Sequence, residues 1–205
     1  FSLDSVMKSD LDMLVEIQQR QTFAYLRELT EKLYRRNPRE LRKQPGATLD
    51  SQLERLFPET PLQPGVDGSP GGIELLGRTF DEQFQGDRVF VLVAGLRDMV
   101  MSAYNHKVEF YFLDEPLDPQ KFYNCARNVE ILLWRLAQEQ RANGEPWVVT
   151  NALDRQAGPV NISYERLFGK LIGQLDLMAL MIADQRNIQI KNLMRSVASA
   201  VFLPV

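Results

Sequence analysis

The chain has 205 residues, of which 44% are hydrophobic and 25% are charged, and its formal net charge is −3. These values are typical of a globular domain, which we place over residues 1–205, and a chain of this length can bury a core without a metal or a disulfide. Because it contains one His and one Cys, an intrachain disulfide, a zinc finger and a His-rich metal centre are excluded, and the slight acidic excess argues against a nucleic-acid binder.

The first predicted element is an amphipathic helix over residues 3–36. Apolar side chains recur there at three- and four-residue steps, the spacing of one helical face. The stripe consists of Met7, Leu11, Leu14, Val15, Tyr25, Leu26, Leu29 and Leu33. Asn37 and Pro38 are predicted to end this helix and begin a short one. Asn37 would be its N-cap, and Glu40 has the spacing of a capping box.

Residues 37–86 are predicted to form an irregular excursion from the helical bundle. It includes a short helix over residues 48–57, in which Ser51 and Glu54 have capping-box spacing. Residues 58–72 contain four Pro and four Gly, a composition that predicts a flexible loop. The loop contains no Lys, so it does not match a phosphate-binding loop.

The apolar stretch over residues 87–95 fits either a buried strand or a helix. Arg88, Gly95 and Asp98 are spaced as on one helical face, which favours a mostly buried helix over residues 87–105 with Asp87 as its N-cap. Residues 107–113 alternate in part and remain open between a loop and a short strand.

Two further helices are predicted, over residues 118–142 and 163–203. Asp118 caps the first, and Cys125 lies on its apolar stripe, where burial would keep the thiol unreactive. The second would be roughly 60 Å long if continuous, so we expect a bend near residues 184–189 or a projecting end. Gly169 and Gly173 would allow another helix to approach closely, within the chain or in a homo-oligomer formed through residues 163–203.

Together these elements predict an all-α fold. We expect an irregular helical bundle of five or six helices, with a Pro/Gly-rich loop and at most one short β-hairpin. No segment approaches the roughly 20 apolar residues of a transmembrane span.

The strongest candidate binding segment is a basic run over residues 32–43. It contains six cations, Lys32, Arg35, Arg36, Arg39, Arg42 and Lys43, and one acid, Glu40. Such a run could contact an anionic surface, lipid headgroups or an acidic protein face. The alternative is a solvated helix end, where cations complement the helix dipole.

A second candidate centres on Arg97, Tyr104 and His106. Nearby aromatic residues could line a pocket between helices; the set is Tyr104, Phe110, Tyr111, Phe112 and Tyr123. His106 fits a helix C-terminus better than a catalytic base, and Asp98 is expected to form a structural salt bridge. We predict no catalytic residue, no metal ligand and no cofactor.

Two functional hypotheses follow. The first is a non-enzymatic protein-interaction or scaffolding module. Because the chain begins at Phe1 rather than Met, we expect a processed accessory protein of the cell envelope. Such a protein would be periplasmic, with a lipid anchor as one possibility. The alternative is a cytoplasmic protein. The second hypothesis is a small-molecule or lipid-binding helical protein, or an enzyme, with a pocket near Arg97 and His106.

Overall fold

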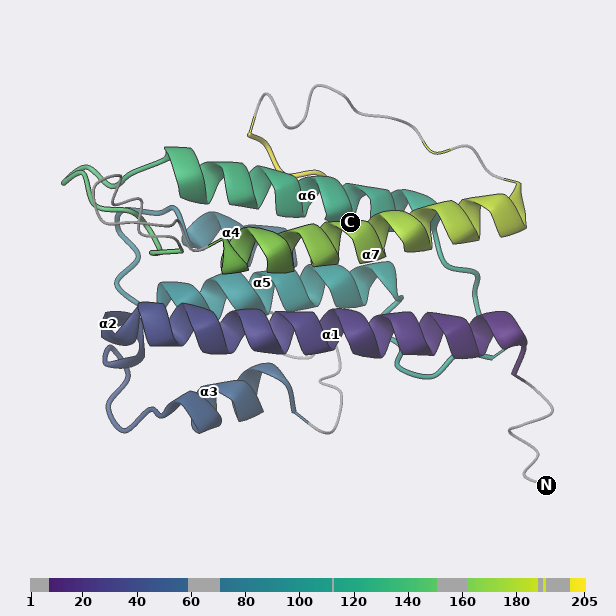
Figure 1. Ribbon diagram of the computed structural model, residues 1–205, viewed down its shortest axis with the longest axis horizontal. Coiled ribbons are helices and arrows are strands. Elements are labelled where there is room, and N and C mark those ends of the chain that lie inside the picture. Colours follow the sequence, from purple (N-terminus) through teal and green to yellow (C-terminus); the bar gives the residue numbers. More distant parts are fainter. Residues whose placement is uncertain (1–7, 59–70, 112, 151–161, 188–189, 191–199) are drawn as a thin grey trace.

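The computed structural model describes residues 8–58, 71–111, 113–150, 162–187, 190 and 200–205. Seven helices occur in these residues (Figure 1): α1 (Asp10–Arg36), α2 (Pro38–Leu41), α3 (Leu49–Leu56), α4 (Gly72–Arg78), α5 (Arg88–Ala103), α6 (Pro119–Gln138) and α7 (Ser163–Arg186). No strand is formed by the described residues, and one isolated bridge joins Gln140 and Pro146. The all-α prediction is therefore confirmed, with α4 as a helix that the sequence did not predict.

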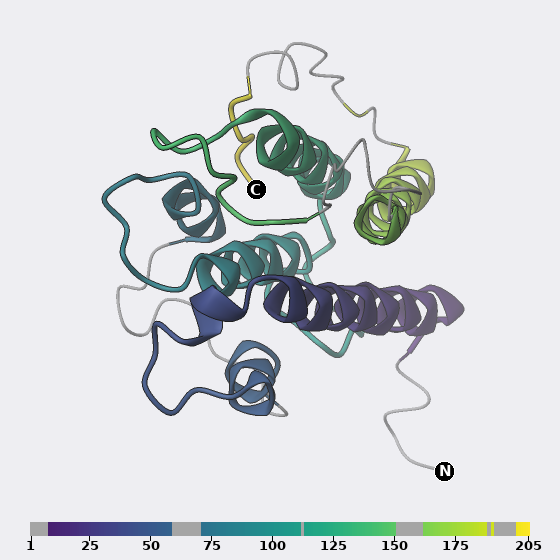
Figure 2. The same cartoon turned by 60° about the vertical axis from the view of Figure 1, so that its left-hand side comes forward.

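Helix α5 lies at the centre of the bundle. It packs against α1, α4 and α6 and also touches α2 and α3, whereas α7 packs mainly on α6 and α1 (Figure 2). Val89, Leu92 and Leu96 on α5 are fully buried. A helix with neighbours on most of its sides must be apolar nearly all round, which is why this segment resembled a buried strand in the sequence.

Local hydrogen bonds decide where the first helices begin. Ser9 caps α1 in a capping box with Asp12, so Lys8 and Ser9 precede the helix and the predicted start at residue 3 lies outside the described residues. The capping box of α3 pairs Thr48 with Ser51 rather than Ser51 with Glu54.

Helix α4 depends on a close approach to α5. A Cβ atom added to Gly95 would lie 2.8 Å from the Gly72 carbonyl oxygen, and one added to Gly72 would lie 2.6 Å from the Met99 nitrogen. The contact brings the Gly72 N–H to the Asp98 carboxylate, which accepts it at 2.7 Å. The predicted salt bridge of Asp98 is wrong: its partner is this backbone N–H at the start of α4.

The later helices are shorter than predicted. Helix α6 ends at Gln138 rather than residue 142, and α7 ends at Arg186, followed by Asn187 in the left-handed conformation with φ 50°. Residues 163–203 are therefore not one continuous helix. Residues 59–70 of the predicted Pro/Gly-rich loop lie outside the described residues. In the possible strand over residues 107–113, residue 112 also lies outside them, and the described residues of this segment form no strand.

Buried amide side chains hold extended segments of the chain against the helices. Asn128 on α6 donates to the Leu203 carbonyl at 2.9 Å and accepts from its N–H at 2.6 Å. Asn124, one turn earlier, donates to the Pro204 carbonyl at 2.8 Å. These contacts satisfy backbone groups that a sheet would otherwise pair, and they dock residues 203–204 on α6.

Candidate functional site

The basic run lies at the junction of α1 and α2, where it forms one wall of a cleft. The segment after α6 forms the other wall, and the cleft has a volume of about 490 Å³. Five cationic residues line it, Arg36, Arg39, Arg42, Lys43 and Arg141, together with two acidic residues, Glu40 and Glu145. We refer to it as the basic cleft. The sequence predicted four of its five cations.

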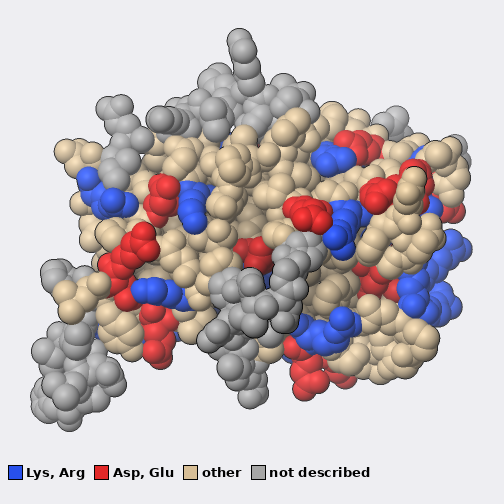
Figure 3. All heavy atoms as spheres, turned by 180° about the vertical axis from the view of Figure 1, so that it is seen from behind, with Lys and Arg blue, Asp and Glu red and all other residues tan. Residues whose placement is uncertain are grey.

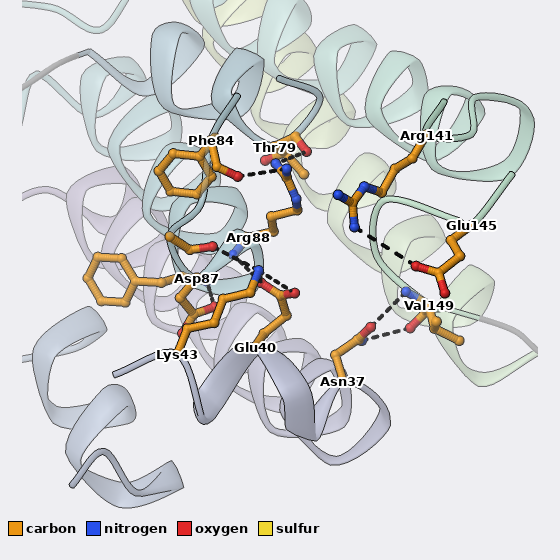
Figure 4. Close-up of polar contacts among 12 residues, drawn as sticks. Asn37, Glu40, Lys43, Thr79, Phe84, Asp87, Arg88, Arg141, Glu145 and Val149 are labelled. Carbon is orange, nitrogen blue, oxygen red and sulfur yellow. Dashed lines mark hydrogen bonds and ion pairs between the residues drawn. The ribbon is translucent and has the colours of Figure 1, made fainter. Parts of the chain in front are cut away.

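Asn37 joins the two walls of the basic cleft. Its side-chain amide donates to the Val149 carbonyl at 2.9 Å, and its amide oxygen accepts the Val149 N–H at 2.8 Å (Figure 4). The same amide nitrogen donates to the Leu33 carbonyl at the end of α1. Asn37 occupies the N-cap position of α2, and Pro38 begins the helix, as predicted, but the Asn37 side chain makes no capping hydrogen bond to α2.

Glu40 and Lys43 attach α2 to the start of α5. The Glu40 carboxylate accepts the Arg88 backbone N–H at 2.6 Å and the Lys43 ammonium at 2.7 Å. Lys43 also donates to the Gly86 carbonyl at 3.0 Å. The charges of Glu40 and Lys43 are thus satisfied within the fold, and neither is free for an outside partner.

Three arginines of the basic cleft remain without a partner. Arg36, Arg39 and Arg42 are exposed, and none forms an ion pair or a side-chain hydrogen bond with the residues that the structure describes. Arg35, by contrast, pairs with Glu31 at 3.5 Å. Figure 3 shows one group of Lys and Arg side chains at the edge of the end that carries α2, and basic and acidic side chains lie side by side over the rest of that face.

The fifth cation of the basic cleft, Arg141, lies on the wall formed by the segment after α6. Its guanidinium lies 3.7 Å from a Glu82 carboxylate oxygen and 3.9 Å from one of Glu145, near the limit for an ion pair, and it points toward Glu145 in Figure 4. Such loose pairing is compatible with exchange for an incoming anion, since guanidinium groups bind carboxylates and phosphates through two parallel hydrogen bonds.

A buried cation, Arg88, lies behind the basic cleft. Its side chain is 2% exposed and donates to the carbonyls of Thr79 at 3.2 Å and Phe84 at 2.7 Å. The Trp147 ring, which also lines the basic cleft, lies 5.2 Å from the guanidinium. Burial lowers the pKa of Arg88, and the neighbouring Arg141 charge adds to this effect. Arg88 is structural, but it adds positive potential behind the cleft.

The second group of predicted site residues is divided between the core, a helix end and a cavity. Tyr104 is fully buried in edge contact with Phe122, with ring centroids 4.8 Å apart, and burial raises its pKa. His106 follows the end of α5 with φ 55°, and its backbone N–H donates to the Met101 carbonyl at 2.7 Å. Arg97 lines a separate cavity. Tyr104 therefore belongs to the core, and His106 terminates a helix, as predicted.

The remaining sequence predictions concern Cys125, the glycines of α7, metal binding and membrane spans. Cys125 is fully buried and burial raises the pKa of its thiol, which confirms its place in the core. Gly169 and Gly173 are exposed on α7, and a Cβ atom added to either would meet no atom of another element within 4 Å. Among the described residues, no cluster of three His, Cys, Asp or Glu side chains is arranged to hold a metal ion. Nor does any described helix have the length and apolar character needed to cross a lipid bilayer.

Comparison of the chain with protein-family models, with curated proteins and with solved structures finds no match in any of the three.

Proposed function

We propose that this chain is a non-enzymatic protein-interaction module that binds an acidic segment of a partner protein in the basic cleft. The observation that carries the proposal is the set of three exposed arginines, Arg36, Arg39 and Arg42, which have no partner in the described structure. Arginine residues without intramolecular partners attract carboxylates and accelerate association with an oppositely charged surface.

The shape of the basic cleft favours a peptide over a membrane surface. A bilayer is flat on this scale and cannot enter a concave site of about 490 Å³, whereas a side chain can. Glu40 and Glu145 also line the basic cleft, so the site is not uniformly basic and suits a ligand that places separate carboxylates on the free arginines. Pro38, Pro146 and Trp147 give it an apolar wall, which suits an acidic segment that also contains an apolar side chain.

A fluorescence-anisotropy titration tests the proposal. The probe is a short labelled peptide rich in Glu and containing one Phe. The triple variant Arg36→Gln/Arg39→Gln/Arg42→Gln is expected to weaken binding about tenfold or more, because each lost charge-assisted contact contributes roughly 1 kcal/mol or more. Added salt is expected to weaken binding to the unaltered protein, since these charges are exposed.

A matched control removes three cations from other places. Arg20 pairs with Glu16, Arg35 pairs with Glu31, and Arg166 is exposed on α7. The variant Arg20→Gln/Arg35→Gln/Arg166→Gln has the same net charge as the cleft variant and is expected to bind the peptide nearly normally. Equal losses of peptide affinity in both variants would contradict a localised site. Binding of the protein to anionic vesicles but not to the peptide would contradict a protein partner and indicate a lipid surface instead. Cell fractionation tests the predicted envelope location independently.

A further inference from the structure

A second cavity lies on another face of α5, between α1 and the residues that follow α3. It has a volume of about 430 Å³, within the range of small-molecule sites. Phe23 of α1, Phe57 and Met101 of α5 form apolar walls. Arg97 of α5 also lines this cavity, and we call it the Arg97 cavity.

Arg97 is a half-buried cation without a partner. Its guanidinium makes no hydrogen bond and no ion pair with any residue that the structure describes. Its sequence neighbour Asp98 is already engaged by the Gly72 N–H at 2.7 Å. Burial lowers the pKa of Arg97, and the Asp98 charge offsets part of this effect. Desolvating a cation without pairing it costs free energy, which a bound anion would recover.

The other charged residues around the cavity are already paired. Glu16 accepts the Lys8 ammonium at 2.6 Å and the Phe110 N–H at 3.1 Å. Arg20 is exposed and lies 3.9 Å from Glu16, and Glu109 accepts the Tyr111 hydroxyl at 3.0 Å. Arg97 is therefore the one charged lining residue without a described partner, and it sets the polarity of a ligand.

We infer that the Arg97 cavity binds a small amphipathic carboxylate, with its apolar body against Phe23, Phe57 and Met101 and its carboxylate on Arg97. A planar guanidinium matches a carboxylate through two parallel hydrogen bonds. The apolar walls supply the burial energy that a short alkyl or aryl group contributes. This site is separate from the basic cleft and independent of the proposed peptide binding.

Isothermal titration calorimetry with decanoate tests the inference, with 1-decanol as the neutral probe of equal chain length. Arg97→Met keeps an unbranched apolar stem of similar shape and removes the guanidinium with its charge. We expect it to weaken decanoate binding about tenfold or more, because a charge-assisted hydrogen bond is lost, and to leave decanol binding unchanged.

The matched control is Arg20→Met, which removes a cation from the exposed rim of the same cavity. It is expected to change decanoate affinity less than about twofold, since an exposed charge is screened by water. Circular dichroism and thermal unfolding check that each variant is folded. Decanoate is expected to raise the melting temperature of the unaltered protein and not that of Arg97→Met.

Three results would overturn the inference. The first is an unaltered protein that does not bind decanoate at about millimolar concentration, where even weak sites of this kind are occupied. The second is an Arg97→Met variant that binds decanoate as tightly as the unaltered protein. The third is an equal loss in Arg20→Met, which would show a general charge effect. If Arg97→Met fails to fold, Arg97→Gln replaces it with the same expected outcomes.

Discussion

Arg88 and Arg97 lie on the same helix, are both removed from water to a large extent, and form no ion pair with a described carboxylate, yet their surroundings differ. Arg88 donates to backbone carbonyls and lies near the rings of Phe84 and Trp147. Arg97 has no such contacts and borders an open cavity. The comparison teaches that burial alone does not distinguish a structural cation from a binding one; the state of its hydrogen-bond donors does.

Replacing each arginine by methionine gives the largest expected contrast. Arg88→Met would leave the buried carbonyl of Thr79 and the partly buried carbonyl of Phe84 without their donor, so we expect it to lower the free energy of unfolding by about 3 kcal/mol. Arg97→Met leaves no acceptor unpaired and removes a desolvated charge, so its effect should stay within about 1 kcal/mol, on the stabilising side.

Urea denaturation followed by circular dichroism measures both effects. The slope of the transition is expected to be unchanged in the two variants, since each keeps the same fold. Equal losses of stability in Arg88→Met and Arg97→Met would remove the distinction between them, and a stable Arg88→Met protein would show that its carbonyl contacts contribute little.

A second test addresses why Asp98 does not pair with Arg97. Asp98 is held by the Gly72 N–H because Gly95 lets α4 approach. Gly95→Ala would place a methyl group 2.8 Å from the Gly72 carbonyl oxygen, and overpacking of this kind costs about 1–3 kcal/mol. We expect Gly95→Ala to destabilise the protein and to weaken the hold of Asp98 on α4.

Gly169→Ala is the matched control for this substitution. Gly169 is also in a helix, but a Cβ added there meets no atom within 4 Å. Alanine is the better helix former by about 1 kcal/mol, so Gly169→Ala should stabilise the protein slightly. A destabilised Gly169→Ala protein would indicate that α7 does not tolerate alanine for a reason other than local space.

The sequence predicted where the long helices lie, though not where α6 and α7 end, because their apolar stripes alone require burial. Leu26, Leu29 and Leu33 recur on one face and are all in the core. Helix α4 could not be predicted in this way, since its start depends on Asp98, which is 26 residues away in the sequence. No local signal shows that Gly95 will face Gly72 at van der Waals distance.

The candidate site was likewise predictable only where its residues are close together in the sequence. Four cations of the basic cleft are adjacent in the sequence and therefore visible as a run. Arg141 joins them because the segment after α6 is attached to Asn37 through the backbone of Val149, a contact between residues 112 positions apart. The free state of Arg97 also depends on tertiary structure, because its neighbour Asp98 is occupied by a distant helix.

The smallest expected effect is a change in the titration of His106, the only histidine in the chain. Burial lowers the pKa of His106 below its usual value near 6.5; the charges of Lys121 and Arg97 add to this effect, and Asp98 opposes it. The unfolded state therefore binds a proton at a higher pH than the folded state does. Stability is expected to fall as the pH drops from about 6.5 through the lowered pKa, and to level off below it.

Removing the Arg97 charge should bring the pKa of His106 back toward 6.5, because one of the cations that oppose protonation is lost. The His106 ring signal in a proton NMR titration measures this directly, without interference from a second histidine. Arg20→Met, which does not alter a charge acting on His106, should leave the titration unchanged.

Decanoate bound at Arg97 would supply a negative charge near His106. It should therefore raise the pKa of His106 in the unaltered protein but not in Arg97→Met. A titration that responds to neither Arg97→Met nor decanoate would mean that Arg97 is screened from its surroundings by water, and the contrast with Arg88 would then rest on stability alone.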